Sequence, residues 1–177
     1  MTEEARLERR EEGLAAVTDG WFVVNVSDAA WVSNDAFGPA CIFEVDEAPF
    51  AQVGYTIAVL SPGRPNGMYH RENAQEDFLV LSGECLLLVE GEERRLRAWD
   101  FVHCPPDTEH IFVGAGDGPC VIFMAGARAP RHETVYTRSE LALRYGAGVE
   151  VETNRSAEAY APFPKWRPGH PGDLEFP

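Results

Sequence analysis

The chain has 177 residues, 45% of them hydrophobic by a broad count, which is enough to bury one good core but too short to expect two. Its 29 acidic side chains outnumber the 15 basic ones, and a formal net charge of −14 argues against nucleic acid as a partner. No apolar run approaches the roughly 18 residues that span a bilayer, and the charged start of the chain does not resemble a secretory signal. We therefore expect a protein away from membranes, whose partner is a small molecule or a second copy of itself.

Four cysteines stand singly in the sequence, without a CxxC pair. This pattern is typical of small buried thiols rather than of a disulfide framework or a zinc knuckle. It favours a reducing, cytoplasmic location.

The first 20 residues are interpreted as a helical extension. Residues 3–12 favour helix, although only Ala5 and Leu7 could pack, and Gly13 is placed to stop the helix. From residue 21 to residue 127 the pattern changes to short β-rich runs with turn residues between them. The expected strands are 21–26, 41–45, 53–60, 78–81, 85–89, 94–97, 101–104, 111–113 and 121–125. Short connections imply antiparallel pairing, and a closed barrel is favoured over a sandwich because closure removes exposed sheet edges.

The remaining residues, 128–177, are expected to form a helix followed by an extended arm. The run Thr137-Arg138-Ser139-Glu140 resembles a capping box that opens a helix through Tyr145, with Gly146 ending it. The last 17 residues hold five prolines and three aromatic residues, which suits an arm lying across the barrel or across a neighbouring subunit. The aromatic residues are Phe163, Trp166 and Phe176.

The stretch from residue 63 to residue 83 carries most of the functional evidence. His70 and Glu72 are two residues apart, so on an extended strand their side chains share one face. Glu76 shares the parity of Phe78 and would stand at one end of an apolar wall, where a buried carboxylate needs a cation or a hydrogen-bond partner.

A second informative stretch covers residues 99–114. A strand runs into the turn Pro105-Pro106, and His110 then opens the next strand with the parity of Phe112, so it too can point inward. Two imidazoles and one or two carboxylates suit one divalent transition metal, Fe, Mn, Zn, Ni or Co, and the residue types do not choose among these.

These two stretches resemble the two sequence motifs of the cupin superfamily, in its single-domain conserved-barrel form. His70, Glu76 and Gly83 fall on the first motif, and Pro105 and His110 fall on the second. The resemblance covers roughly residues 60–126. It implies an all-β fold, a single antiparallel jelly-roll barrel (double-stranded β-helix) with short terminal helical extensions, together with a metal near its middle and a homodimer.

The sequence departs from the motifs at several positions. Glu72 stands where the family has a second histidine, Asp107 replaces a glycine, Gly114 replaces an asparagine, and the spacer after Gly63 is one residue longer. A carboxylate in place of an imidazole lowers the charge of the site by one and favours harder metals. The expected metal ligands are therefore His70, Glu76 and His110 with Glu72 as the fourth, while Glu72 as a general acid or base remains the alternative.

Two functions follow from these residues. The first is a metal-dependent enzyme with dioxygenase-like or isomerase-like activity on a small organic molecule, since apolar side chains near the ligands suit such a substrate. The second is a non-enzymatic barrel that binds or senses a small molecule and uses the metal as structural support. The sequence alone does not decide between an enzyme and a binding protein.

Overall fold

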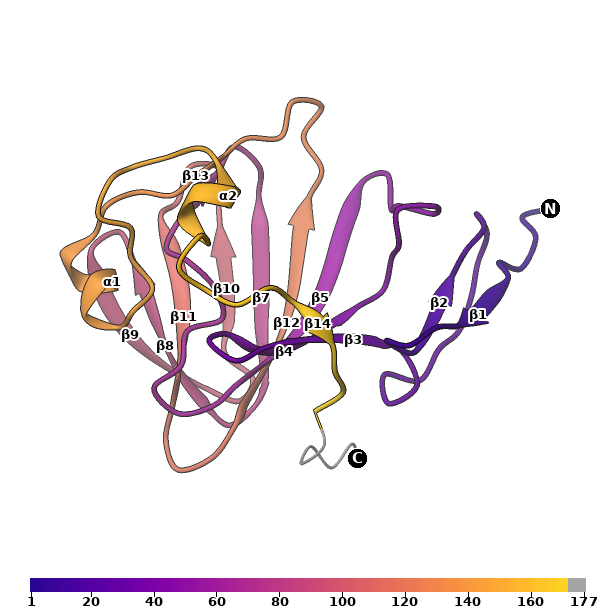
Figure 1. Ribbon diagram of the computed structural model, residues 1–177, viewed down its shortest axis with the longest axis horizontal. Coiled ribbons are helices and arrows are strands. Elements are labelled where there is room, and N and C mark those ends of the chain that lie inside the picture. The colour runs from indigo at the N-terminus through magenta and orange to yellow at the C-terminus, as the bar shows by residue number, and fades with distance from the viewer. Residues whose placement is uncertain (172–177) are drawn as a thin grey trace.

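A computed structural model describes residues 1–171 and consists mainly of two antiparallel sheets packed face to face (Figure 1). The larger sheet has the strand order β10-β7-β12-β5-β4-β3-β14, and the smaller has the order β11-β8-β9. The larger contains β10 (Phe101–Cys104), β7 (Glu76–Ser82), β12 (Cys120–Ala127), β5 (Val53–Leu60), β4 (Gly38–Ile42), β3 (Ala30–Asn34) and β14 (Arg167–Pro168), and the smaller contains β11 (His110–Ala115), β8 (Glu84–Val89) and β9 (Glu92–Arg97). The predicted antiparallel barrel is confirmed.

The core lies between the two sheets and follows the alternation of each strand. Phe78, Val80 and Ile122 of the larger sheet meet Leu87 and Phe112 of the smaller one, and these five residues are at most 5% exposed. The opposite face of the smaller sheet is covered by α1 (Glu140–Arg144). All four cysteines are buried and free, as expected.

Eight of the nine expected strands are present, with bounds that differ by a few residues. The segment 21–26 is not a strand; its Val24 and Val26 instead pack beside Trp31 on the outer face of the larger sheet. Burial of these apolar side chains without sheet pairing explains why the segment resembles a strand in sequence. The strand β3 was not anticipated.

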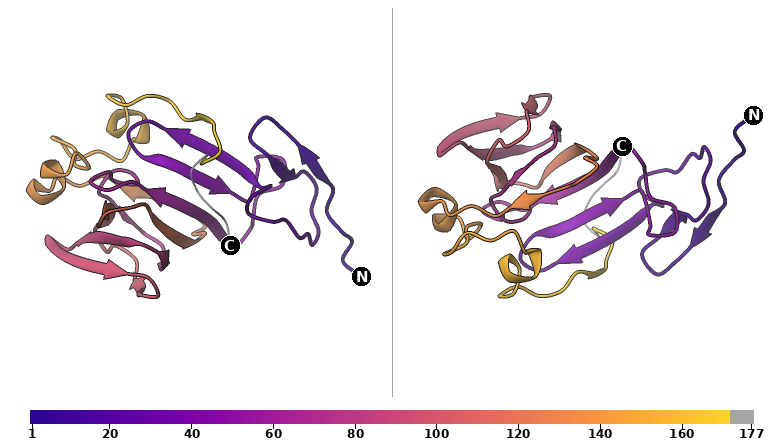
Figure 2. Two further views of the ribbon diagram at one scale, coloured as in Figure 1. Left: turned by 90° about the horizontal axis from the view of Figure 1, so that it is seen from below. Right: turned by 90° about the horizontal axis from the view of Figure 1, so that it is seen from above.

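The prediction of a helix at the N-terminus is wrong. Residues there form a hairpin of β1 (Leu7–Arg9) and β2 (Leu14–Ala16), which lies beyond the edge of the barrel (Figures 1 and 2). A turn joins Arg10 and Gly13, and Gly13 has a φ of 138°, which glycine adopts readily. The local helix preference is weak, and pairing that buries Ala15 and Ala16 overrides it.

The C-terminal helix is confirmed, with its cap shifted. Ser139, not Thr137, is the N-cap of α1 and accepts a hydrogen bond from the backbone N–H of Ala142, while Gly146 follows the helix with a φ of 69°. A second short helix, α2 (Ser156–Ala159), was not expected. None of the helices among residues 1–171 is long and apolar enough to cross a membrane.

The chain then returns across the barrel to pair β14 with β3 (Figure 1). Two of its aromatic residues, Phe163 and Trp166, pack on the ring of Phe37, at centroid distances of 4.8 and 6.4 Å. Phe176, the third aromatic residue of the predicted arm, lies outside the described residues. Within the described part, the arm lies on the barrel of its own chain.

Candidate metal centre

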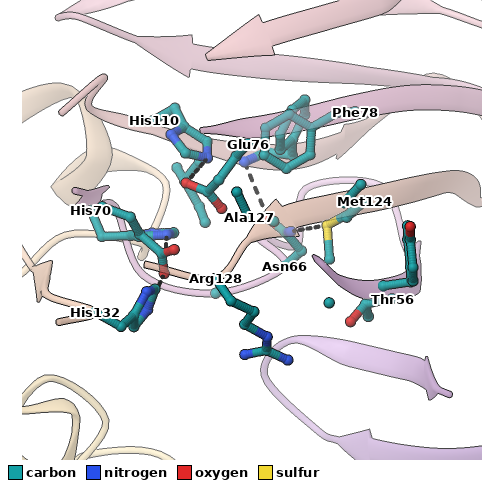
Figure 3. A pocket seen from close by; sticks show the side chains of 18 of the residues that line it. Thr56, Asn66, His70, Glu76, Phe78, His110, Met124, Ala127, Arg128 and His132 are labelled. Atoms are coloured by element: carbon teal, nitrogen blue, oxygen red, sulfur yellow. Dashed lines mark hydrogen bonds and ion pairs between the residues drawn. The ribbon is translucent and has the colours of Figure 1, made fainter. Parts of the chain in front are cut away.

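Three predicted ligands meet inside the barrel. The ligand atoms of His70, Glu76 and His110 all lie within 4.8 Å of one another. His70 and His110 face each other as a bridged pair, with backbone N–H to carbonyl distances of 3.2 and 2.8 Å, and Glu76 opens β7 in the opposite sheet. The two sheets together therefore form the cluster (Figure 3).

The two imidazoles are oriented by carbonyl groups of their own segments. His70 Nδ1 lies 2.7 Å from the Met68 carbonyl oxygen, and His110 Nδ1 lies 3.0 Å from that of Thr108. A carbonyl oxygen can only accept, so each Nδ1 carries the proton and donates it. Each Nε2 is then left with its lone pair free, which is the state in which an imidazole binds a metal.

Burial keeps both imidazoles neutral at pH 7. Burial lowers the pKa of His70. Burial, and to a smaller extent the neighbouring His70, lowers the pKa of His110 to about 4. The Nε2 of His110 and Oε2 of Glu76 are 3.6 Å apart, too far for a hydrogen bond but close enough to share one cation.

Glu76 is the acidic member of the cluster. Its side chain is only 14% exposed, and no hydrogen bond to its carboxylate is found within residues 1–171. Burial, followed by the repulsion of Glu72, raises the pKa of Glu76 to about 8. A buried carboxylate with no donor is stabilised by a cation, and two imidazoles with one carboxylate form a mixed nitrogen and oxygen set that suits a divalent transition metal. The residues present therefore fit such a metal.

Glu72 lies at the rim of this cluster rather than within it. Thr134 Oγ1 donates to Glu72 Oε1 at 3.1 Å, across the pairing of β6 (Arg71–Glu72) with β13 (Thr134–Val135). The same oxygen is 3.4 Å from His132 Nε2 and 3.9 Å from His70 Nε2. The role of Glu72 as fourth ligand remains a prediction, because these partners equally suit a group that accepts and donates protons.

The cluster opens into a cavity of about 300 Å³. Apolar side chains of Phe78, Phe112, Ile111 and Met124 cover part of its wall, as the sequence indicated for the two phenylalanines. The cavity also has polar lining residues that sequence reasoning missed. They are Glu44, Thr56, Asn66, Arg128, His132 and Tyr160.

His132 and Arg128 are the two most informative of these missed residues. His132 looks like a solvated loop residue in the sequence, and its side chain is indeed 42% exposed, yet it contacts Glu72. Its spacing of two from Thr134 was the available signal, since both share one face of an extended segment. Arg128 follows the end of β12 directly and keeps the inward parity of Met124.

Comparisons with known proteins relate the barrel to one family. Residues 56–126 match the family model described as a cupin domain. No curated protein matches the chain significantly.

Solved structures with a similar fold include two isomerases and a cyclase. A sugar phosphate isomerase from Silicibacter pomeroyi is 17% identical over 75% of this chain and 92% of the other, with a TM-score of 0.57. A polyketide cyclase from Streptomyces resistomycificus is 14% identical over 63% and 83%, with a TM-score of 0.53. A proposed sugar phosphate isomerase from Acidithiobacillus ferrooxidans is 24% identical over 50% of this chain, and the chain spans only 58% of that protein, with a TM-score of 0.46. At these sequence identities, the similarity shows a shared fold and not a shared function.

Proposed function

Because the chain belongs to the cupin superfamily of conserved-barrel proteins and gathers two imidazoles and a carboxylate in an open cavity, we propose that it is a metal-dependent enzyme acting on a small organic molecule. The ligands are His70, Glu76 and His110, and the cofactor is one divalent transition metal per chain. The observation that carries the proposal is the orientation of both histidines, whose Nδ1 protons are held by carbonyls so that both Nε2 lone pairs are free.

Each group of the cavity has a distinct part in this function. A divalent metal would supply Lewis acidity to an oxygen of the bound substrate. Glu76 contributes the negative charge that the two neutral imidazoles lack. Phe78 and Phe112 line the cavity beside the cluster and limit the access of water to it. Glu72 and His132 stand in contact at the rim, where a proton can be held or passed on.

The reaction class is proposed to be isomerase-like or dioxygenase-like. Two histidines and one carboxylate form the facial arrangement of non-heme iron oxygenases, which supports the second class. The Silicibacter pomeroyi protein with a similar fold is named a sugar phosphate isomerase, which supports the first class only by analogy of fold.

Metal analysis followed by turnover assays tests the proposal. We expect about one divalent metal per chain after loading, and either consumption of oxygen or rearrangement of a substrate, detected by NMR, against a panel of small organic compounds. A protein that takes up no metal overturns the proposal. A protein that binds metal and a small molecule without turnover supports instead the non-enzymatic binding function.

The role of Glu72 is tested with Glu72→Gln. If Glu72 is the fourth ligand, this substitution weakens metal affinity. If Glu72 transfers protons, metal affinity stays near that of the wild type while turnover falls.

We further propose a homodimer in the cytoplasm. The exposed aromatic side chains Trp99 and Phe101, which are 76% and 65% exposed at the edge of the larger sheet, support association. The four buried free cysteines suit a reducing compartment.

A further inference from the structure

A row of four residues crosses the larger sheet on the face that lines the cavity. Strand register places Gly126 of β12 beside Glu76 of β7 on one side and beside Gly54 of β5 on the other. Glu44 continues the row just past the end of the next strand, β4. Ile42 pairs with Thr56 in antiparallel register, so the position two residues after Ile42, Glu44, lies beside the position two residues before Thr56, Gly54. The two middle positions carry no side chain, so the wall between the two carboxylates is bare backbone.

The side chain of Arg128 lies over this bare wall. A Cβ atom at Gly54 would stand 2.5 Å from Arg128 Nη2 and 3.0 Å from Cζ, so the guanidinium occupies the space that glycine leaves. Figure 3 shows Arg128 across the cavity from His110 and Glu76. Neighbouring strands lie about 4.8 Å apart, so Gly54, two strands from Glu76, lies about 10 Å from it along the sheet.

One hydrogen bond holds the guanidinium directly, and two more fix its partner Glu44 and the Arg128 backbone. Glu44 Oε1 accepts a hydrogen bond from Arg128 Nη2, and the other oxygen of Glu44 accepts one from the Phe50 backbone N–H at 2.6 Å. The Arg128 backbone N–H donates to the Gln52 carbonyl at 2.8 Å. The charged group is therefore positioned before any ligand arrives, which lowers the entropic cost of binding.

Several hydrogen-bond donors on this side of the cavity have no strong acceptor within the described part of the chain. Among the described residues, Nε and Nη1 of Arg128 have no hydrogen bond, and the Arg128 side chain is 44% exposed. The Asn66 amide reaches only the Met124 thioether, at 3.5 Å, which is a weak acceptor, while its oxygen accepts from the Phe112 N–H at 3.1 Å. No hydrogen bond from the Thr56 hydroxyl is found in this part of the chain. These free N–H and O–H groups could donate hydrogen bonds to a ligand group with several acceptor oxygens.

We propose that the cavity takes a small organic acid, whose anionic group binds Arg128 with help from Asn66 and Thr56 while its remainder reaches the His70, Glu76 and His110 cluster. This inference rests on the proposed function and adds the substrate class to it. Among residues 1–171, Arg128 is the one lysine or arginine that lines the cavity, so it favours a ligand with a single anionic group. A carboxylate and a phosphate share the required chemistry. The volume of about 300 Å³ limits the acid to a small molecule.

Calorimetric titration of the zinc-loaded protein tests the inference, with benzoate, phenyl phosphate and the neutral benzamide as probes. We expect benzoate or phenyl phosphate to bind at least about tenfold more tightly than benzamide, the size of a charge-assisted hydrogen bond. The stronger of the two identifies the acid as a carboxylate or a phosphate. Equal binding of all three probes overturns the inference.

Two variants assign the effect to Arg128. Arg128→Gln removes the charge and should abolish the preference for the acid. Gly54→Ala keeps the charge but displaces the flexible end of Arg128, and it should weaken acid binding by several-fold with little effect on folding, because the φ of Gly54 is not positive. The matched control is Arg138→Gln, since Arg138 is also paired with a glutamate and its side chain is 48% exposed. Acid binding that is unchanged in Arg128→Gln overturns the inference.

Failure of the inference is separable from failure of the proposed function. Zinc content is measured on the same samples before each titration. A protein that holds zinc but shows no preference for acids disproves only the role of Arg128. A protein that holds neither zinc nor iron, manganese, nickel or cobalt disproves the metal-dependent function, while a preference for acids that Arg128→Gln abolishes would still establish Arg128 as an anion-binding residue.

Discussion

Replacing Glu76 by glutamine should stabilise the metal-free protein, and the gain should grow with pH. Burial and Glu72 raise the pKa of Glu76 from 4.5 to about 8. The folded state thus binds the proton more tightly than the unfolded state, so stability falls as the pH rises from 4.5 towards 8. Glutamine resembles the protonated acid and does not titrate, so it escapes this loss.

The size of the effect follows from the two pKa values. Each pH unit between them costs about 1.4 kcal/mol. At pH 7 the penalty on the wild type is therefore about 3 kcal/mol, and at pH 5 it is below about 1 kcal/mol. Relaxation of the site and entry of water reduce these figures, so a gain of about 2 kcal/mol at pH 7 is a realistic expectation.

Urea unfolding of protein treated with a chelator measures the difference at pH 5, 6, 7 and 8. Saturating metal should reverse the order, because a metal at 100 times its Kd adds about 2.7 kcal/mol to the wild type and less to Glu76→Gln. The control is Glu92→Gln on β9, where the side chain is 60% exposed. A metal-free Glu76→Gln protein that is no more stable than the wild type at pH 8 refutes the reasoning.

Three further predictions concern other parts of the molecule. His110→Ala should lower the metal content after loading from about one per chain to near zero, by mass spectrometry of the metal; full occupancy would show that His110 is not a ligand. Gly83→Ala should cost at least about 2 kcal/mol in urea unfolding, because its φ is 74° and a Cβ would stand 2.4 Å from the Pro119 carbonyl oxygen. Gly91→Ala, with a φ of 77° and open space around it, should cost clearly less, and equal costs would contradict the steric argument. Replacing both Trp99 and Phe101 by serine should convert the dimer to a monomer in light scattering, and a wild-type protein that is already monomeric contradicts the dimer.

The sequence predicted the barrel well because most of its strands are apolar on alternate positions and are separated by turn residues. It also pointed to the three residues His70, Glu76 and His110, which the structure brings together, since each lies at a strand end with inward parity; their role as metal ligands stays a prediction. The N-terminal hairpin was missed because its residues have a local preference for helix, and only pairing between the two strands Leu7–Arg9 and Leu14–Ala16 reverses it.

The rim of the cavity was harder to predict than its centre. Glu72 and Thr134 meet through the pairing of two strands of two residues each, and His132 precedes that pairing in an irregular segment. The spacing of two between His132 and Thr134 places both side chains on one face, but it does not show that this segment returns to the site. Arg128 depends in addition on the absence of a side chain at Gly54, a relation between neighbouring strands that only their register reveals.

The ligand cluster joins the two layers of the barrel, because His110 belongs to the smaller sheet and Glu76 to the larger one. A metal bound by residues of both sheets would hold the two sheets at a fixed distance from each other at this point. Loading the site should therefore slow amide hydrogen exchange in β7 and β11 together, although the two strands belong to different sheets. Because the same residues line the cavity, metal occupancy would also affect the width of the cavity and so the size of the molecule that fits in it.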